Sequence, residues 1–189
     1  MSADPHPWAN DLAELHAQVW TRLARGVHDR HAPARHPTLA TVTPDGLPQA
    51  RTVVLRAADR GSGNVECHTD IHSAKVRQLR ATPFAVLHVW DSVAHLQFRL
   101  EAEATILKGA DVAAIWARVP EPSRLAYGST PAPGQPVAHA LGYTRKPDPA
   151  CFAVIRLHLL ALDVLHLGPS HRRARFMRTD NWAGQWLAP

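Results

Sequence analysis

Arg51, Thr69, Ser73 and Lys75 have the side-chain types and spacing of an anion-binding site. A serine at the start of a helix can cap that helix, and the free N–H groups of a helix start attract anions. Lys75 falls in the first turn of the expected helix, and an arginine can hold an anion through two parallel hydrogen bonds. The four residues therefore indicate a phosphate cradle that lacks a glycine-rich loop. The alternative is a capped helix with two solvated cations.

Arg56 belongs to the same stretch as Arg51, RTVVLR at residues 51–56. Side chains alternate along a regular strand, so two residues five positions apart face opposite sides. One pocket on one face of the strand cannot hold both arginines unless a bulge or a second subunit intervenes. We therefore group Arg51, and not Arg56, with the cradle.

The elements that must position these residues follow from the periodicity of the apolar side chains. A helix is predicted over residues 10–28, where Asn10 or Asp11 can cap and leucines and valines recur at helical spacing. A short helix is predicted over 73–80, ending before Pro83. Strands and turns fill most of the region between and just after these helices. The predicted strands are 38–43, 48–58, 64–69, 84–90 and 95–107, with turns at 44–46 and 58–64.

The segment 95–107 has the clearest pattern in the chain. Apolar residues from Leu96 to Ile106 alternate with polar ones, which predicts a strand with one core face and one face that is wet or lines a site. Helical segments are predicted at 109–118 and 122–127, followed by a proline-rich loop at about 128–150 that is either functional or mobile. A bent or bulged strand is predicted at 151–167. A closing hairpin begins at 173, and Trp182 and Trp186 are expected to share a face of its last strand.

Strands joined by short turns, with helices at the start and as insertions, predict a mainly β protein with peripheral helices and an antiparallel barrel. The length of 189 residues suits a single domain, which we expect to span residues 1–189. No secretory signal and no apolar run of 18 residues occur, so we expect a cytoplasmic protein that does not span a membrane.

The composition narrows the class of ligand. The net charge of +5 is compatible with an anionic ligand or with nucleic acid. The arginines stand among aliphatic residues and not among aromatic ones, which argues against a nucleic-acid-binding barrel. Cys67 and Cys151 are too few for a zinc site or a disulfide framework, and Cys67 is expected to be a small buried residue. We expect no metal site, because His28, His31 and His36 lack a fixed facial spacing.

Several fragments in order resemble one known family. RTVVLR, HTD-x-x-S-x-K, a proline eight residues after that lysine, VLHVWD and HLQFRLEAEA are similar to the FMN-binding split barrel of the pyridoxamine 5′-phosphate oxidase-like proteins. The C-terminal stretch RRARFMRT-DN-WAGQWLAP resembles the closing hairpin of the same family. The resemblance implies an antiparallel split β-barrel of the FMN-binding type and a homodimer that holds FMN between its subunits.

The resemblance also implies roles for individual residues. Arg51, Val53 and Val54 fall on the strand that lines the FMN phosphate and ring, and Arg56 falls where a basic residue touches substrate. His68 and Thr69 match the aromatic-threonine pair beside the flavin, and Ser73 and Lys75 match the phosphate-binding helix start. Gln97 matches a glutamine that the partner subunit supplies near the ring, and Arg175 matches a late arginine near the ring.

Four departures set this chain apart from the oxidase itself. Ala74 replaces an arginine next to the lysine, and Leu165 replaces a tryptophan against the flavin. Where the oxidase has a substrate-binding Arg-Leu-His, this chain has His171-Arg172-Arg173. The region from Tyr127 to Pro133 lacks the Gln-Ser pair of the oxidase. We therefore predict an FMN-dependent oxidoreductase of unknown substrate that does not turn over pyridoxamine phosphate well. The alternative is a non-enzymatic flavin- or haem-binding protein on the same barrel, and we name no catalytic residue.

Overall fold

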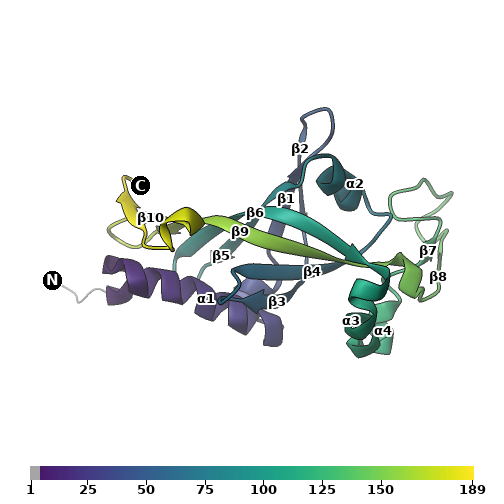
Figure 1. Ribbon diagram of the computed structural model, residues 1–189, viewed down its shortest axis with the longest axis horizontal. Coiled ribbons are helices and arrows are strands. Elements are labelled where there is room, and N and C mark those ends of the chain that lie inside the picture. Colours follow the sequence, from purple (N-terminus) through teal and green to yellow (C-terminus); the bar gives the residue numbers. More distant parts are fainter. Residues whose placement is uncertain (1–4) are drawn as a thin grey trace.

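The computed structural model describes residues 5–189, and its strands form an antiparallel sheet with helices around it (Figure 1). This mainly β architecture with a few helices confirms the predicted fold class. The strands are β1 Thr38–Val42, β2 Pro48–Thr52, β3 Leu55–Asp59, β4 Asn64–Asp70, β5 Phe84–Asp91, β6 Leu96–Lys108, β7 Ser129–Thr130, β8 Thr144–Arg145, β9 Phe152–His166, β10 Arg172–Met177 and β11 Gln185–Leu187. The α-helices are α1 Leu12–His28, α2 Ala74–Ala81, α3 Ala113–Arg118 and α4 Glu121–Arg124.

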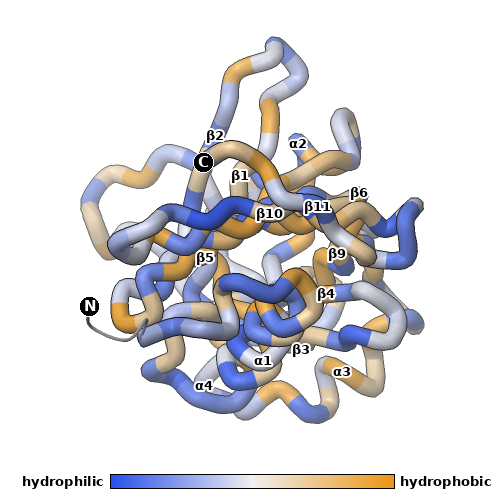
Figure 2. Tube along the Cα trace, turned by 90° about the vertical axis from the view of Figure 1, so that its left-hand side faces the viewer, coloured by the Kyte–Doolittle hydropathy of each residue, from blue (hydrophilic) through white to orange (hydrophobic). Residues whose placement is uncertain are grey.

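The long strand β9 organises the sheet. The order of the main path is β11-β10-β9-β6-β5-β1-β2, and β4 joins β9 on the edge that also carries β10. Residues 152–158 of β9 pair with β4, and residues 161–166 pair with β10. Among residues 5–189 no ladder joins β2 to β3, so the sheet does not close into a ring. The barrel is therefore split, and the β1–β2 hairpin stands out from the body of the molecule (Figures 1 and 2).

A bulge bends β9, as the sequence predicts for so long a strand. The ladder between β6 and β9 pairs Glu101 with Ala161 and Ala102 with Leu159, so Leu160 is the extra residue. The bulge also separates His158 from His166, whose eight-residue spacing places them on one face only in an unbroken strand. The two histidines therefore do not form a shared site.

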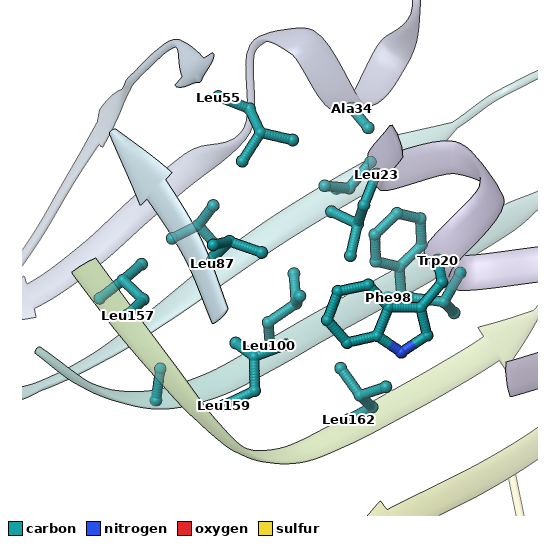
Figure 3. Close-up of a cluster of buried hydrophobic side chains, with 14 of the residues drawn as sticks. Trp20, Leu23, Ala34, Leu55, Leu87, Phe98, Leu100, Leu157, Leu159 and Leu162 are labelled. Carbon is teal, nitrogen blue, oxygen red and sulfur yellow. The ribbon is translucent and has the colours of Figure 1, made fainter. Parts of the chain in front are cut away.

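The predicted alternation on β6 is confirmed by burial. Leu96, Phe98, Leu100 and Ala102 are buried, and the residues between them are more exposed. Their apolar face meets α1 and the other strands in one large cluster, part of which is drawn in Figure 3. Trp20 and Leu23 of α1 reach into this cluster from the helix side. The apolar stripe of α1 therefore covers one face of the sheet.

The ends of α1 are fixed by specific hydrogen bonds. The Asp11 carboxylate accepts a hydrogen bond from the Glu14 N–H at 2.9 Å, which resolves the choice of cap in favour of Asp11. At the other end, Arg35 donates to the carbonyl of Val27 at 2.7 Å and to the carbonyl of Leu55 at 3.0 Å. This arginine ties the end of the helix to β3.

The segment predicted as one strand over 48–58 is two strands, so its predicted continuity was wrong. The β1–β2 ladder ends at Thr52, and the Val53 N–H donates instead to the carbonyl of Pro37 at 3.0 Å. β3 then pairs with β4 through a ladder with an irregularity after Leu55. The alternation argument for Arg51 and Arg56 therefore does not apply, because no single strand carries both.

The C-terminal hairpin forms as predicted, but its tryptophans are placed differently. β10 pairs with β11 after a turn in which Asn181 and Trp182 have φ of 50° and 62°. Trp182 precedes β11 and stacks on His16 with ring centroids 5.9 Å apart, whereas Trp186 lies on β11 and is 45% exposed. The prediction that the two tryptophans share a strand face was wrong because the left-handed turn ends the extended backbone before Trp182.

The region 109–150 is less regular than the sheet. The predicted helix at 109–118 begins with a 3-10 turn, Gly109–Val112, before α3, and the helix predicted at 122–127 is the single turn α4. Within the loop 128–150, β7 and β8 form a two-stranded pair. Gly128 has φ of +105°, and a Cβ there would lie 2.3 Å from the Lys146 carbonyl oxygen. None of the helices in residues 5–189 is long and apolar enough to cross a membrane.

Candidate functional site

The start of α2 and the end of β4 bring three of the predicted cradle residues into contact. Lys75 Nζ donates to Thr69 Oγ1 at 3.0 Å, and Thr69 Oγ1 lies 3.1 Å from Ser73 Oγ. Ser73 occupies the N-cap position of α2, yet its side chain makes no capping hydrogen bond. Its hydroxyl therefore points to the Thr69–Lys75 group, and the helix start is not closed by its own cap.

Arg51 reaches the same helix from β2. Its guanidinium donates to Gln78 Oε1 at 3.0 Å and to the Leu39 carbonyl at 3.2 Å, and it also contacts the hydroxyl of Thr41. Thr41 in turn donates to Gln78 Oε1 at 2.6 Å. Gln78 is buried on the inner side of α2, so this polar link fixes β1, β2 and α2 relative to one another.

The two cations of the cradle are close enough to influence each other. Burial lowers the pKa of the Lys75 ammonium, the nearby Arg51 lowers it further, and Asp70 opposes the shift. Burial also lowers the pKa of Arg51. Neither cation has a carboxylate ion pair among the described residues. Two neighbouring, partly desolvated cations without a counter-ion favour an anion site over the alternative of two solvated side chains.

Arg56 and His68 lie in a different place, which we call the Arg56 cavity. This cavity of about 370 Å³ lies between the β3–β4 pair and the α3 region. Its lining residues are Arg56, Ala57, Glu66, His68, Ile115, Arg118, Val119 and Pro120. His68 and Thr69 are consecutive on β4, so their side chains face opposite sides of that strand. The cradle and the Arg56 cavity therefore flank β4 from its two faces.

Burial and charge keep His68 neutral. Desolvation, and then the charge of Arg56, lowers the pKa of His68 to about 4. The His68 ring meets Phe152 edge-to-face, with centroids 5.0 Å apart. Tyr127 lies next to Arg56, and burial raises the pKa of its hydroxyl while Arg56 opposes the rise. At neutral pH His68 thus offers an uncharged ring to the cavity.

Gln97 on β6 and Arg175 on β10 alternate with buried residues, so they lie on the outer face of the sheet, and no hydrogen bond among the described residues joins either to the cradle. Arg175 on β10 holds Glu101 on β6 with two hydrogen bonds of 3.0 and 2.6 Å. Asp163 of β9 accepts from Arg99 at 2.6 Å and from Arg173 at 2.9 Å. Burial opposes ionisation of Asp163, but the hydrogen bonds from these arginines outweigh it and lower its pKa.

An apolar groove connects the cradle wall with this arginine cluster. The groove has a volume of about 400 Å³. It is lined by Ala40, Thr41, Val42, Pro48, Phe84, Ala85, Val86, Glu101, Ala102 and Leu160. Thr41 contacts Arg51, and Glu101 contacts Arg175, so the groove runs between a cradle residue and a residue predicted to lie near the flavin ring.

The predicted site residues therefore fall into four groups. Thr69, Ser73 and Lys75 meet at the cradle, and Arg51 reaches the same helix at Gln78. Arg56 and His68 share the Arg56 cavity, and Gln97 and Arg175 lie on the outer sheet face. Val53 and Val54 lie in the bend between β2 and β3, where Val53 is buried. The sequence reasoning missed Thr41 and Gln78. Gln78 carries a usable signal, because it is a polar residue between the apolar Val76 and Leu79 of the short helix.

Two other sequence expectations concern cysteine and metal. Cys67 is fully buried, as predicted, and desolvation raises its thiol pKa to about 12. Within residues 5–189 no group of three or more His, Cys, Asp or Glu side chains is arranged to hold a metal ion. The buried, protonated thiol of Cys67 therefore adds no reactive group beside the cradle.

A family model described as the FMN-binding domain of pyridoxamine 5′-phosphate oxidase matches residues 8–108, which is more than half of the chain. The chain belongs to this family. Curated relatives in the family include pyridoxine/pyridoxamine 5′-phosphate oxidase 2 of Arabidopsis thaliana, 27% identical over 51% of this chain and 50% of the relative. The oxidase of Gloeothece citriformis is 41% identical over 47% of this chain and 40% of the relative. The matches thus span about half or less of these relatives' length.

Solved structures also match the whole chain. A pyridoxamine 5′-phosphate oxidase-related, FMN binding protein from Nostoc punctiforme has a TM-score of 0.76 and 26% identity, and the match covers 100% of both chains. PhzG from Burkholderia lata has a TM-score of 0.73 and 21% identity over 100% of this chain and 98% of that chain. At 21% identity, the likeness to PhzG shows a shared fold only. Together with the open sheet, these matches make the fold an FMN-binding-type split barrel.

Proposed function

We propose that the protein binds FMN non-covalently and acts as an oxidoreductase on a substrate other than pyridoxamine phosphate. The observation that carries the proposal is the pairing of Lys75 and Arg51 without a carboxylate counter-ion, beside the hydroxyls of Thr69 and Ser73. A phosphate monoester supplies the charge and the acceptor oxygens that such a group lacks.

The cradle residues fit a phosphate in kind and in number. Lys75 supplies a point charge, the two hydroxyls supply donors, and the uncapped start of α2 supplies a favourable end of a helix dipole. Arg51 would close the group from β2, while Gln78 keeps its guanidinium in position. Ala74 removes one family cation, so Arg51 and Lys75 are expected to carry the phosphate charge between them.

FMN, when bound, supplies hydride or electron transfer, and the protein supplies position and electrostatics. In the proposed complex Val53 and Val54 lie at the bend beside Arg51, where apolar side chains suit a flat ring. Donors aimed at the ring favour the negative charge of its reduced form. Gln97 and Arg175 are the candidates for that role, with Gln97 supplied by a second subunit.

A homodimer is part of the proposal because one chain does not gather all the candidate residues. The apolar groove exposes Phe84 to 54% and Leu160 to 38%, and Leu47 on the projecting hairpin is 60% exposed. Apolar side chains exposed together on one face suit an interface. A two-fold axis at this face would make two equal sites.

The decisive experiment is a titration of apo-protein with FMN and with riboflavin. The proposed cradle requires FMN to bind at least about tenfold more tightly, because only FMN carries the phosphate. Equal affinities for FMN and riboflavin would show that no phosphate cradle exists. If neither compound binds, the proposal that the protein is a flavoprotein is wrong. A Soret band in the purified protein, lost on changing one histidine, would favour the haem-binding alternative.

A further inference from the structure

Another cavity lies where α1 runs beside the C-terminal hairpin (Figure 1), and we call it the His16 cavity. Its volume is about 320 Å³. It is lined by Ala13, His16, Trp20, Arg60, Asn181, Trp182 and Ala183. Arg60 lies in the turn before β4, whereas Thr69 of the cradle lies near the far end of that strand. The His16 cavity is therefore separate from the cradle.

Hydrogen bonds to backbone carbonyls fix the two turns that form part of this cavity. Arg178 donates to the Ser62 carbonyl at 3.0 Å and to the Leu159 carbonyl at 3.2 Å, which ties the C-terminal turn to the turn between β3 and β4. The Trp182 N–H donates to the Met177 carbonyl at 3.0 Å. The segments that carry Arg60 and Trp182 are thereby held in place relative to each other.

His16 presents an unpaired N–H to the cavity. The residue is 7% exposed, and its Nε2 accepts the Trp20 indole N–H at 3.2 Å. Burial, and then the charge of Arg60, lowers the His16 pKa to about 4, so at pH 7 the ring is neutral and carries its proton on Nδ1. No hydrogen bond among residues 5–189 uses this Nδ1–H, and protein atoms do not enclose it, so it opens to the cavity that His16 lines. A largely buried donor without an acceptor is unfavourable until a ligand supplies one.

Arg60 adds one positive charge that no carboxylate balances. No ion pair among the described residues involves it. The neighbouring Asp59 carboxylate accepts instead from the Gly61 N–H at 2.9 Å and from the Ser62 hydroxyl at 2.6 Å. No aspartate or glutamate lines the cavity, and Arg60 is the one cationic side chain in its described lining. The cavity therefore combines a single positive charge with the neutral His16 donor.

Two tryptophans give the cavity aromatic walls. The Trp182 ring stacks on His16 with centroids 5.9 Å apart and 25° between the planes, and the Trp20 ring meets His16 edge-to-face at 6.5 Å. Aromatic rings favour such offset and edge-to-face neighbours. The volume of about 320 Å³ lies at the lower end of the range of small-molecule sites, roughly 300–1,000 Å³, so a body of one or two rings suits it.

We infer that the His16 cavity binds a small planar aromatic carboxylate, which accepts from the His16 Nδ1–H and from Arg60 while its ring lies against the tryptophans. A carboxylate supplies both the negative charge that Arg60 lacks and the acceptor oxygen that His16 lacks. A phosphate dianion carries a second charge, for which the described lining holds no second cation. This site is distinct from the proposed FMN site and does not require FMN to be bound.

The test compares three probes of similar size on the full chain by isothermal titration calorimetry at neutral pH. The probes are 2-naphthoate, its neutral amide 2-naphthamide, and the saturated, non-planar decahydronaphthalene-2-carboxylate. We expect 2-naphthoate to bind at least about tenfold more tightly than the amide and at least about fivefold more tightly than the saturated carboxylate. Equal affinity for 2-naphthoate and 2-naphthamide would overturn the carboxylate, and equal affinity for the two carboxylates would overturn the aromatic ring.

Two variants and one control assign the binding to this cavity. Arg60→Gln should remove the preference for 2-naphthoate over 2-naphthamide, and Trp182→Leu should remove the preference over the saturated carboxylate. Arg30→Gln removes an exposed arginine beyond the end of α1 and should leave all three affinities within about twofold. An unchanged preference for 2-naphthoate in Arg60→Gln would place the binding elsewhere and overturn the inference. If Trp182→Leu does not fold, the exposed Arg60→Gln decides.

Discussion

At the scale of single residues, Lys75 and Arg51 are the two cations of the proposed cradle, but different contacts hold them. Lys75 has a single hydrogen bond, to Thr69, whereas Arg51 is built into the link between Thr41 and Gln78. Removing Lys75 should therefore affect the ligand, and removing Arg51 should affect both the ligand and the fold. The two substitutions separate binding from stability.

Lys75→Ala should weaken FMN binding at least about tenfold while the free energy of unfolding changes by less than about 1 kcal/mol. Arg51→Ala should weaken binding at least as much and also cost roughly 1–3 kcal/mol of stability, because the buried Gln78 and Thr41 lose a partner. FMN fluorescence titration and urea unfolding measure the two effects, with the exposed Arg80→Ala as control. Unchanged FMN affinity in a folded Lys75→Ala variant would show that Lys75 is a solvated side chain and not a phosphate ligand.

The burial of His16 predicts how the free energy of unfolding changes with pH. It is 7% exposed, accepts a hydrogen bond from the Trp20 indole at 3.2 Å, and has a pKa lowered to about 4 by burial and by Arg60. The unfolded chain binds this proton first, near pH 6.5, so stability is full above that pH and falls as the pH drops toward 4.

Urea unfolding between pH 7 and pH 5 should show a loss of roughly 1–2 kcal/mol attributable to His16. His16→Gln should flatten the pH dependence by about that amount, while the exposed His31→Gln should not. His68, whose pKa is also about 4, adds a loss of the same sign. A pH profile unaltered by His16→Gln would mean that His16 does not stay neutral in the fold.

At the scale of elements, Asp70 connects the cradle with the proline-rich loop. It is buried at the end of β4, and its carboxylate accepts the N–H of Gly128 at 3.0 Å and the N–H of His72 at 2.8 Å. The same residue raises the pKa of Lys75 against the effect of burial. The base of the loop is thereby fixed to the strand that carries Thr69.

Asp70→Asn should loosen the loop 128–150, because an amide cannot accept at both positions and one backbone N–H loses its partner. Trypsin should then cut faster after Arg145, whereas the exposed Asp111→Asn should leave the rate unchanged. Mass spectrometry of the early fragments measures the rate. Equal cleavage of Asp70→Asn and the native protein would show that β7, β8 and Gly128 hold the loop without this carboxylate.

At the scale of the whole molecule, the exposed apolar groove predicts a dimer. Phe84 lies in the groove and is 54% exposed, so Phe84→Glu would place a charge at the proposed interface. We expect the native protein to scatter light as a dimer at micromolar concentration and Phe84→Glu to be monomeric with weaker FMN binding. Ala24→Glu, on the exposed side of α1, is the control. A native monomer that holds FMN tightly would refute the shared site.

Pyridoxamine phosphate should be a poor substrate. Arg173, in the segment that replaces the oxidase's Arg-Leu-His, is held by Asp163 at 2.9 Å, and Leu165 provides no aromatic ring. A site that loses its polar partners loses discrimination for the original substrate. Oxygen-dependent formation of pyridoxal phosphate measures turnover. A rate near one per second, at the low end of ordinary enzymes, would show that these changes do not matter.

Much of the fold could be predicted from local sequence, because interactions between residues close along the chain determine these elements. The alternation on β6 requires one buried face, the capping residue fixes the start of α1, and the length of β9 requires a bend. The contacts of Thr69 with Lys75 and with Ser73 also follow from proximity along the chain, since a short turn joins β4 to α2. These features involve neighbours in sequence.

Only the tertiary structure decided the features that depend on distant partners. The Val53 N–H leaves the ladder for Pro37, which divides RTVVLR between two strands. Gln78 and Thr41 hold Arg51 from elements that lie 27 and 10 residues away. The Arg56 cavity needs α3 against β4, and Trp182 leaves the strand to stack on His16. Spacing within a sequence sets which side chains can meet locally, but competition among distant backbone and side-chain partners sets which of them do.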